Sequence, residues 1–208
     1  MAAGPQFPAD AFAKPDAADD AEFYAIPRLV THIDPGAIAA LTEFYRGMLP
    51  EGGVLLDLMS SWVSHLPEDV AYAEVIGHGM NADELNANPR LGRRIVQDLN
   101  RDHRLPFGPG SVDAAMICVS IQYLQRPAAV LAEVARVLKP GAPVVISFSN
   151  RCFPTKAVAI WRALDAAGQA RLVSLYLERA GFAAMETRRL REGAGCDPLT
   201  VVIGRTSA

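Results

Sequence analysis

Apolar residues follow two alternating patterns along the chain, short continuous runs and helical repeats. The runs predict buried strands at 54–58, 72–77, 93–99, 112–120 and 142–150. Helical repeats lie between or after them, at 37–48, 82–88, 126–141, 155–166 and 168–180. Two further strand candidates, 182–190 and 199–205, close the chain with no helix between them. Strands alternating with helices predict an α/β fold, a mainly parallel sheet covered on both faces, whose two closing strands pair antiparallel.

Residues that start and stop helices support these limits. Pro50, Gly52 and Gly53 follow the helical repeat that ends at residue 48. Asn81 stands where an N-cap is expected for the stretch 82–88. Pro127 suits the first turn of the helix within 126–141. The predicted elements are therefore bounded by ordinary turn and cap chemistry.

Composition limits the class of protein. A chain of 208 residues that is 50% hydrophobic is long enough for one domain with a real core. A net charge of −3 gives no broad basic surface for nucleic acid. Cys118, Cys152 and Cys196 lie far apart, with no CxxC spacing, so we expect no metal site and no disulfide framework. This cysteine usage fits the reducing cytoplasm.

The first 22 residues contain three prolines and four aspartates with little apolar periodicity. This composition predicts a flexible tail over 1–22. No basic start is followed by an apolar core, so we expect no signal peptide. No apolar stretch approaches 18 residues, so we expect no membrane span and a cytoplasmic protein. The oligomeric state is left open.

The stretch "LPFGPGSVDAAMICVSIQYLQRPAAVLAEVARVLKPGAPVVISFSN" carries a family resemblance. It resembles the middle of class I S-adenosylmethionine-dependent methyltransferases, and "RVLKPG" (136–141) is its most specific part. The resemblance runs from about residue 37 to 204. It implies a Rossmann-like, seven-stranded mixed sheet in a single domain over 37–208. It also implies S-adenosylmethionine as the cofactor, lying over the carboxyl ends of the first, second and fourth strands.

The expected cofactor loop, "VLLDLMSSWVSHLP" (54–67), departs from the family pattern. Asp57 matches the family's acidic residue at the end of the first strand. Met59, Ser61 and Val63 stand roughly where the family has glycines, which permit positive φ and close backbone approach. The hydroxyls of Ser60 and Ser61 offer hydrogen bonds instead. Two hypotheses stay open, a remodelled binding loop and a loop that has lost binding.

Three further segments are candidates for the cofactor. The family has an acidic residue for the ribose near Gly79; here Asn81 follows, as a neutral ribose ligand or simply as a helix cap. Asp98 and Leu99 match the residues that meet the adenine, unless Asp98 only caps a turn. Ser120, after the fourth strand, is expected to line the same crevice.

Acceptor residues are less well specified. The segment 23–36 occupies the place of a family lid, and its Tyr24 and Arg28 are candidates for the substrate. A surface strap packed by Phe23 and Leu29 is the alternative. Gln122 and Tyr123 are further candidates for contact with cofactor or acceptor, although Tyr123 could instead pack against the next helix. Asn150, Arg151 and Lys156 would suit an anionic acceptor, unless the arginine and the lysine are ordinary solvated charges.

No catalytic triad or paired acid and base is found, because the four histidines are scattered. His32 is a weak first guess for a base. Methyl transfer needs little more than alignment, so this absence weighs little. The sequence favours a methyltransferase for a small-molecule acceptor with an atypical cofactor loop. The alternative is a non-catalytic, methyltransferase-like binding protein. A nicotinamide dehydrogenase ranks third, because "LMSSWV" contains no GxGxxG.

Overall fold

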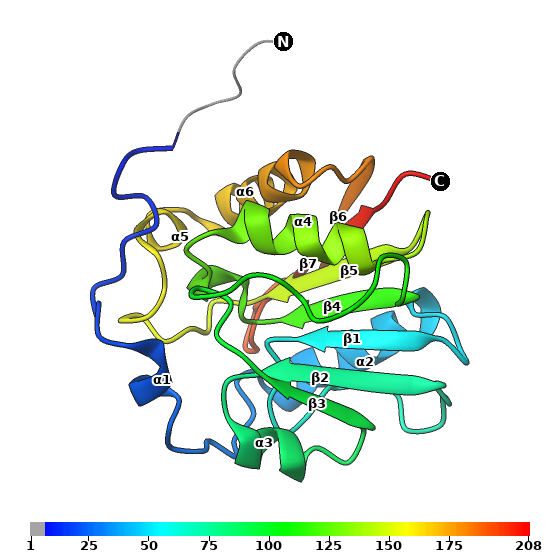
Figure 1. The fold of residues 1–208 in the computed structure, drawn as a ribbon. Helices are drawn as coiled ribbons and strands as arrows, with labels where there is room; N and C mark the ends of the chain where they lie inside the picture. Colours follow the sequence, from blue (N-terminus) through cyan, green and yellow to red (C-terminus); the bar gives the residue numbers. More distant parts are fainter. Residues whose placement is uncertain (1–6) are drawn as a thin grey trace.

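The computed structural model describes residues 7–208. Its strands form a single seven-stranded sheet (Figure 1). The strand order is β3–β2–β1–β4–β5–β7–β6, and only β7 runs antiparallel to its neighbours. The predicted mixed sheet and antiparallel closing pair are confirmed. The strands are β1 (Val54–Leu58), β2 (Glu74–Gly79), β3 (Arg93–Val96), β4 (Ala114–Cys118), β5 (Pro143–Phe148), β6 (Ala184–Arg191) and β7 (Leu199–Arg205).

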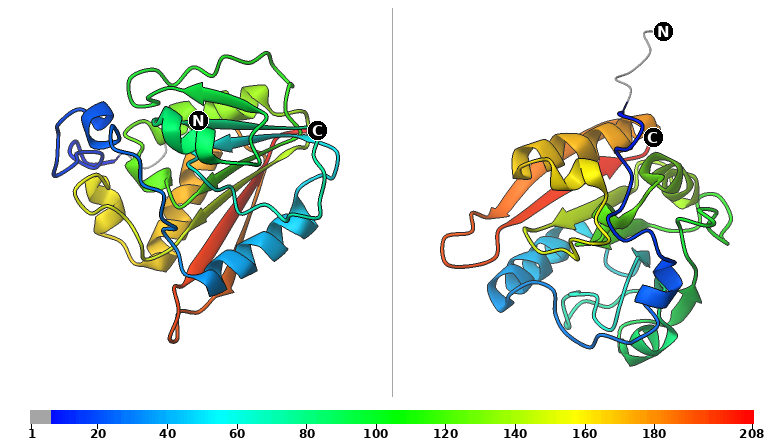
Figure 2. Two further views of the ribbon diagram at one scale, coloured as in Figure 1. Left: turned by 90° about the horizontal axis from the view of Figure 1, so that it is seen from below. Right: turned by 90° about the vertical axis from the view of Figure 1, so that its left-hand side faces the viewer.

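Helices cover both faces of the sheet (Figures 1 and 2). One face packs against α4, α5 and α6, and the other against α2 and α3. A short helix α1 lies apart from both layers, at the end of the sheet where the parallel strands finish. The helices are α1 (Asp20–Phe23), α2 (Pro35–Met48), α3 (Ala82–Ala87), η1 (Ile121–Tyr123, a 3₁₀ turn), α4 (Pro127–Val137), α5 (Ala159–Arg162) and α6 (Ala166–Arg179).

Strands β1 and β4 form the centre of the sheet, as predicted. Leu55 to Leu58 pair with Ala114 to Ile117, and nearly every side chain in both strands is buried. Their sequences are continuous apolar runs because helices cover both faces of a central parallel strand. β1 lies between β2 and β4, so the strand order reverses direction at β1 and makes it the switch point of the sheet. Crevices at such a switch point, over the carboxyl ends of the strands, are where ligands settle in open α/β sheets.

Most predicted elements are shorter in the structure by a few residues at one or both ends, and two differ in other ways. β2 spans 74–79 rather than 72–77, so His78 and Gly79 belong to the strand. The helix expected over 155–166 is reduced to four residues, α5. The backbone N–H groups of Val158 and Ala159 donate to Gln122 O and Ala13 O, at 3.0 and 2.9 Å. Tertiary hydrogen bonds therefore replace the first turn of the expected helix.

Residues 7–22 correct the prediction of a flexible tail over 1–22; residues 1–6 lie outside the described part of the chain. Phe7 and Phe12 pack against Tyr176, with ring centroids 6.0 and 6.2 Å away. The ammonium of Lys156 is fully buried, at 3.0 Å from Asp16 Oδ2 and 3.2 Å from Asp20 Oδ1. Paired charges and aromatic packing thus hold a segment whose composition alone resembles disorder.

Candidate functional site

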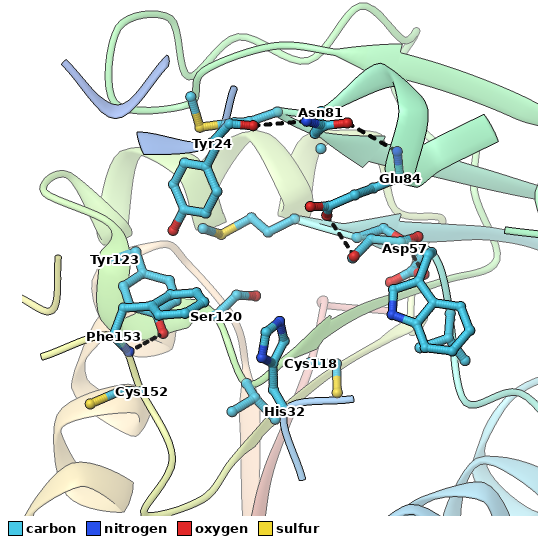
Figure 3. Close-up of a pocket in the computed structure, with 18 of the residues that line it drawn as sticks. Tyr24, His32, Asp57, Asn81, Glu84, Cys118, Ser120, Tyr123, Cys152 and Phe153 are labelled. Atoms are coloured by element: carbon cyan, nitrogen blue, oxygen red, sulfur yellow. Dashed lines mark hydrogen bonds between the residues drawn. The ribbon is translucent and has the colours of Figure 1, made fainter. Parts of the chain in front are cut away.

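A cavity of about 570 Å³ lies over the carboxyl ends of β1, β2 and β4 (Figure 3). Its volume falls within the range of small-molecule and cofactor sites. The residues expected to hold the cofactor all line it, and so do Tyr24, His32, Tyr123 and Arg151 from the acceptor candidates. The cofactor candidates are Asp57, Ser60, Ser61, Asn81, Asp98, Leu99 and Ser120.

The loop after β1 makes its tight turn without glycine. Met59 adopts a left-handed conformation with φ of 58°, which is uncommon for a side chain of that size. The Ser60 N–H donates to His78 O at 2.6 Å, which draws the loop against β2. A Cβ on Gly79 would lie 2.5 Å from Ser60 O. The glycine that permits close backbone approach therefore lies on β2, at or near the position where the resemblance leads one to expect an acidic residue.

Asp57 is a buried carboxyl at the base of this loop. Its side chain is 3% exposed, and desolvation raises its pKa to about 6, against a hydrogen bond from Ser60 Oγ at 2.6 Å that favours the charged form. Among residues 7–208 no ion pair compensates it. A buried carboxylate without a cation is a ready site for a ligand ammonium group.

Glu84 was not among the candidates from the sequence, and it connects the loop after β1 with the segment 23–36, which was expected to act as a lid. Its Oε2 accepts from Ser61 Oγ at 2.6 Å, and its Oε1 accepts from the Arg28 N–H at 2.7 Å. Its carboxylate faces the cavity next to Asp57 (Figure 3). The spacing Asn81-x-x-Glu84 is the available signal, but it reads as a helix capping box rather than as a site.

Asn81 caps α3, as the alternative interpretation of this residue predicts. Its Oδ1 accepts from the Glu84 N–H at 3.0 Å. Its Nδ2 donates to Tyr24 O and Ala25 O, at 2.9 and 3.2 Å. The amide is therefore engaged by the helix and by the start of the lid segment, although it still lines the cavity.

Asp98 and Leu99 border the cavity after β3. Asp98 Oδ1 accepts from the Asn100 N–H at 2.8 Å in a local turn, and its Oδ2 lies 3.8 Å from Arg101 Nε. Within residues 7–208 the Leu99 N–H has no hydrogen-bond partner. The Ser120 hydroxyl, at the end of β4, is likewise buried without a partner in the described chain. Such orphaned polar groups fit a polar ligand.

The segment 24–34 crosses the mouth of the cavity as a strap. Trp62 Nε1 donates to Val30 O at 3.0 Å, so this indole joins the loop after β1 to the strap. The Asp34 N–H donates to Asp197 Oδ2 at 2.9 Å, which fixes the end of the strap. His32 points from the strap into the cavity, and burial lowers its pKa (Figure 3).

Aromatic rings form the wall opposite Asp57. Tyr123 stacks on Phe153 with centroids 5.8 Å apart, and its hydroxyl accepts from the Phe153 N–H at 2.9 Å. His32 meets the same Phe153 ring edge-on, at 5.3 Å. Tyr24 completes the wall from the strap (Figure 3). No local pattern singles out Phe153, because its place in the site depends on contacts between segments that are distant in the chain.

The other acceptor candidates lie differently from what the sequence suggests. Arg28 does not line the cavity; its guanidinium lies 4.3 Å from the Phe23 ring centroid, which keeps it within the strap. Asn150 is exposed and lies outside the lining, and Gln122 is buried in the core. Arg151 reaches the cavity, but its Nε lies 2.8 Å from Asp197 Oδ1. With Lys156 bound to the N-terminal segment, no uncompensated cation faces an acceptor from this set.

Within residues 7–208, no group of three His, Cys, Asp or Glu residues could hold a metal ion. The described helices also lack the length and apolar character that crossing a membrane would require.

Three comparisons relate the chain to known proteins. Residues 60–146 match a family model described as a methyltransferase domain. No curated protein sequence matches the chain significantly. The [4+2]-cyclase SpnF aligns with a TM-score of 0.65 at 16% identity, over 88% of this chain and 89% of that chain. A SAM-dependent methyltransferase from Aquifex aeolicus aligns with a TM-score of 0.59 at 17% identity, over 83% of this chain and 93% of that chain.

The structural likenesses, at these identities, establish the fold. The domain match runs from the loop after β1 through β2, β3 and β4 to Ile146 in β5, and β1 with Asp57 lies outside it. The match to the methyltransferase-domain model covers 87 of the 208 residues, and the strand order and the acid at the end of β1 are those that the resemblance to class I S-adenosylmethionine-dependent methyltransferases implies.

Proposed function

We propose that this protein transfers the methyl group of S-adenosylmethionine to a small-molecule acceptor. The observation that carries this proposal is Asp57, a buried carboxyl without a cation partner in the described chain, inside a cavity of cofactor size. When bound, the cofactor supplies a methyl group already activated by a sulfonium. The protein's task is then to bind and align, which accounts for the absence of a strong catalytic group.

The cavity offers partners for three polar parts of that cofactor, its ammonium group, its ribose hydroxyls and its heterocycle. Asp57 is placed to receive the ammonium group. Glu84 presents a carboxylate beside the glycine-containing end of β2, where it can accept hydrogen bonds from hydroxyls in place of the acid missing at Gly79. Asp98 and the free Leu99 N–H provide an acceptor and a donor for a heterocycle. These assignments support a remodelled loop over one that has lost binding.

The strap would perform two tasks in this reaction. Crossing the mouth of the cavity, it excludes water from the reacting groups. Its His32, uncharged at neutral pH because burial lowers its pKa, can accept a proton from an acceptor that must lose one. Tyr24, Tyr123 and Arg151 complete the acceptor side.

Calorimetric titration with S-adenosylmethionine and with S-adenosylhomocysteine tests the proposal directly. We expect saturable binding of both, with dissociation constants below the millimolar range. Equal titrations with ATP, which lacks the ammonium and carries phosphates, serve as the control, and we expect no binding there. Absence of binding at millimolar S-adenosylmethionine would remove the methyltransferase proposal.

Asp98→Ala is expected to weaken S-adenosylhomocysteine binding by about 1–3 kcal/mol, the usual loss for a hydrogen bond to a charged group. Asp102→Ala is the matched control, because Asp102 also caps a turn, through Arg104 N, but does not line the cavity. Calorimetry with circular dichroism on both variants separates affinity from folding. Equal affinities for the two variants would leave Asp98 as a turn residue only.

Glu84→Gln is expected to weaken cofactor binding about tenfold, because a neutral amide accepts hydrogen bonds less strongly than a carboxylate. The amide NH₂ would also oppose either Ser61 Oγ or the Arg28 N–H. Asp83→Asn, an exposed acid on the same helical turn, is the control. Binding unchanged in Glu84→Gln would show that this carboxylate acts only between the loop and the strap.

A second candidate function is ligand binding without methyl transfer. Side chains at Met59, Ser61 and Val63, where the family has glycines, are the observation that favours it. The fold also hosts other chemistry, as the similarity to a cyclase illustrates. If the protein binds S-adenosylmethionine and S-adenosylhomocysteine but transfers no methyl group to any acceptor, this second candidate is supported.

A further inference from the structure

The backbone turn that follows β4 is strained at its first residue. Val119 adopts a left-handed conformation, with φ of 48°. For a β-branched residue this conformation is an outlier, because Cβ comes too close to the following carbonyl oxygen. Val119 is buried and lines the cavity, so the strain lies at the candidate site. Strain of this kind persists only where the surrounding structure imposes it.

Two hydrogen bonds hold Val119 in this conformation, one at each of its peptide groups. Its N–H donates to Ser147 O in β5, at 2.9 Å, which continues the pairing of β4 with β5. Its carbonyl accepts from Gln122 Nε2, at 2.8 Å. The φ and ψ angles of a residue set how its two planar peptide groups are oriented, so fixing both groups fixes the residue between them. The side chain of Gln122 therefore supplies the contact that the sheet does not.

Gln122 is the residue of this turn that lies in the core. Its side chain is 1% exposed, and its carbonyl accepts from the Val158 N–H at 3.0 Å, which attaches the turn to the segment before α5. Ser120 and Tyr123, by contrast, line the cavity (Figure 3). Burying an amide costs free energy, and the hydrogen bond to Val119 offsets part of that cost. The amide is thus placed to act on the backbone of the turn.

Ser120 depends on this geometry because it directly follows Val119. It is buried, and within residues 7–208 its hydroxyl neither caps η1 nor meets another partner. A change in the backbone angles of Val119 would turn the peptide group between the two residues, and the hydroxyl would move with it. The strained turn therefore sets where an unpartnered polar group lies at the cavity (Figure 3).

We propose that Gln122 is a positioning residue for the cofactor. It holds Val119 in the left-handed conformation, and this keeps the Ser120 hydroxyl in place at the end of β4. The assignment rests on the proposed methyltransferase function, in which the cofactor lies over the carboxyl ends of β1, β2 and β4. A serine hydroxyl both donates and accepts, so it suits a polar group of the cofactor without adding charge. Gln122 acts through Val119 and Ser120 and touches no ligand itself.

Glycine distinguishes this role from ordinary core packing. It adopts the left-handed conformation without the steric cost that valine has. With glycine at position 119, no such cost would oppose the observed turn after loss of the Gln122 amide. If Gln122 acts through the backbone of Val119, Val119→Gly should restore what the loss of the amide removes. If Gln122 only fills space in the core, a change at position 119 cannot restore it.

A double-mutant cycle on the full chain tests the assignment. Gln122→Met keeps the length and apolar bulk of the side chain and removes the amide; it is combined with Val119→Gly. Calorimetric titration with S-adenosylhomocysteine should show binding weakened about tenfold in Gln122→Met and less than about threefold in Val119→Gly. The double variant should bind within about threefold of Val119→Gly. Gln125→Met is the control and should leave affinity unchanged, because Gln125 lies outside the lining and donates to Phe12 O at 3.3 Å.

A second measurement needs no ligand. The amide-to-α-proton coupling of Val119 and its carbon chemical shifts, measured by nuclear magnetic resonance, report its backbone angles. We expect a left-handed residue in the wild type and a changed conformation in Gln122→Met. If Gln122→Met does not fold, a folded double variant supports the assignment and an unfolded one contradicts it.

Two results would overturn the assignment. One is a Val119 that stays left-handed in folded Gln122→Met, and the other is a double variant that binds as weakly as Gln122→Met. Failure of the wild type to bind S-adenosylhomocysteine would instead remove the proposed function. In that case the conformation of Val119 still decides whether Gln122 holds the turn.

Discussion

Asp57→Asn is expected to abolish measurable S-adenosylmethionine binding at micromolar concentrations while making the folded protein more stable at neutral pH. The carboxylate is 3% exposed and has no compensating cation in the described chain, so its charge destabilises the fold. Asparagine keeps an oxygen that can accept from Ser60 Oγ but carries no charge. The same charge that costs stability is the one proposed to attract the ligand ammonium.

The pH dependence follows from the raised pKa. Because burial holds the pKa of Asp57 at about 6, the native state binds a proton more tightly than the unfolded chain does. The free energy of unfolding therefore falls as pH rises from about 4 to about 6, and the loss is constant above that window. At pH 7 the asparagine variant should be more stable by at most about 3 kcal/mol, and below about pH 4 the difference should vanish.

Denaturant unfolding of both proteins between pH 4 and 8 measures this difference. Asp113→Asn is the opposite control, because pairing with Lys139 Nζ at 2.6 Å lowers the pKa of Asp113. Neutralising Asp113 should reduce stability at pH 7, by less than about 1 kcal/mol for such a partly exposed pair. If Asp57→Asn loses stability at pH 7, or still binds the cofactor like the wild type, Asp57 does not have the role proposed.

Gly79→Ala is expected to cause the second large effect, loss of cofactor binding together with about 1–3 kcal/mol of stability. The added Cβ would lie 2.5 Å from the backbone oxygen of Ser60, and a backbone atom cannot rotate away. Either the loop shifts off β2 or the strand distorts, and both change the position of Ser60 above Asp57. Gly79→Asp, which restores the family's acidic residue type, should fail for the same reason.

Gly108→Ala is the control for this substitution, since a Cβ there meets no atom within 4 Å and the backbone is not left-handed. Thermal unfolding and calorimetry with S-adenosylhomocysteine give the two readouts. A Gly79→Ala variant with the stability and affinity of the wild type would show that the loop is free to move away from β2.

Much of the fold follows from local patterns in the sequence. The buried runs at β1 and β4, the cap at Asn81 and the first-turn proline Pro127 are short-range signals, and the structure confirms these elements. Tertiary hydrogen bonds decide the exceptions. The segment before α5 donates its N–H groups to residues far away in the chain, so a helical apolar pattern at 155–166 forms only one turn.

The site was partly visible for the same reason. Asp57 and Asp98 lie near the carboxyl ends of two predicted strands, so the parallel sheet alone brings them to one edge. Glu84 was hidden, because its contacts with Ser61 and Arg28 join residues 23 and 56 positions away. The close approach at Gly79 was hidden as well, since a one-dimensional pattern shows a missing acid and not the carbonyl that takes its space.

The strap and the N-terminal segment also determine when the site can form during synthesis. Asp34 closes the end of the strap on Asp197, 163 residues later, and Asp20 depends on Lys156. A ribosome adds roughly 5–20 residues per second. Several seconds therefore pass between the synthesis of Asp20 and Asp34 and the synthesis of the residues that they contact. During that interval the completed β1 and its buried acid have no cover. Nascent chains of this protein should therefore be held as open, chaperone-accessible intermediates until translation reaches the closing hairpin, and folding at the site should be limited by high contact order rather than by local helix formation.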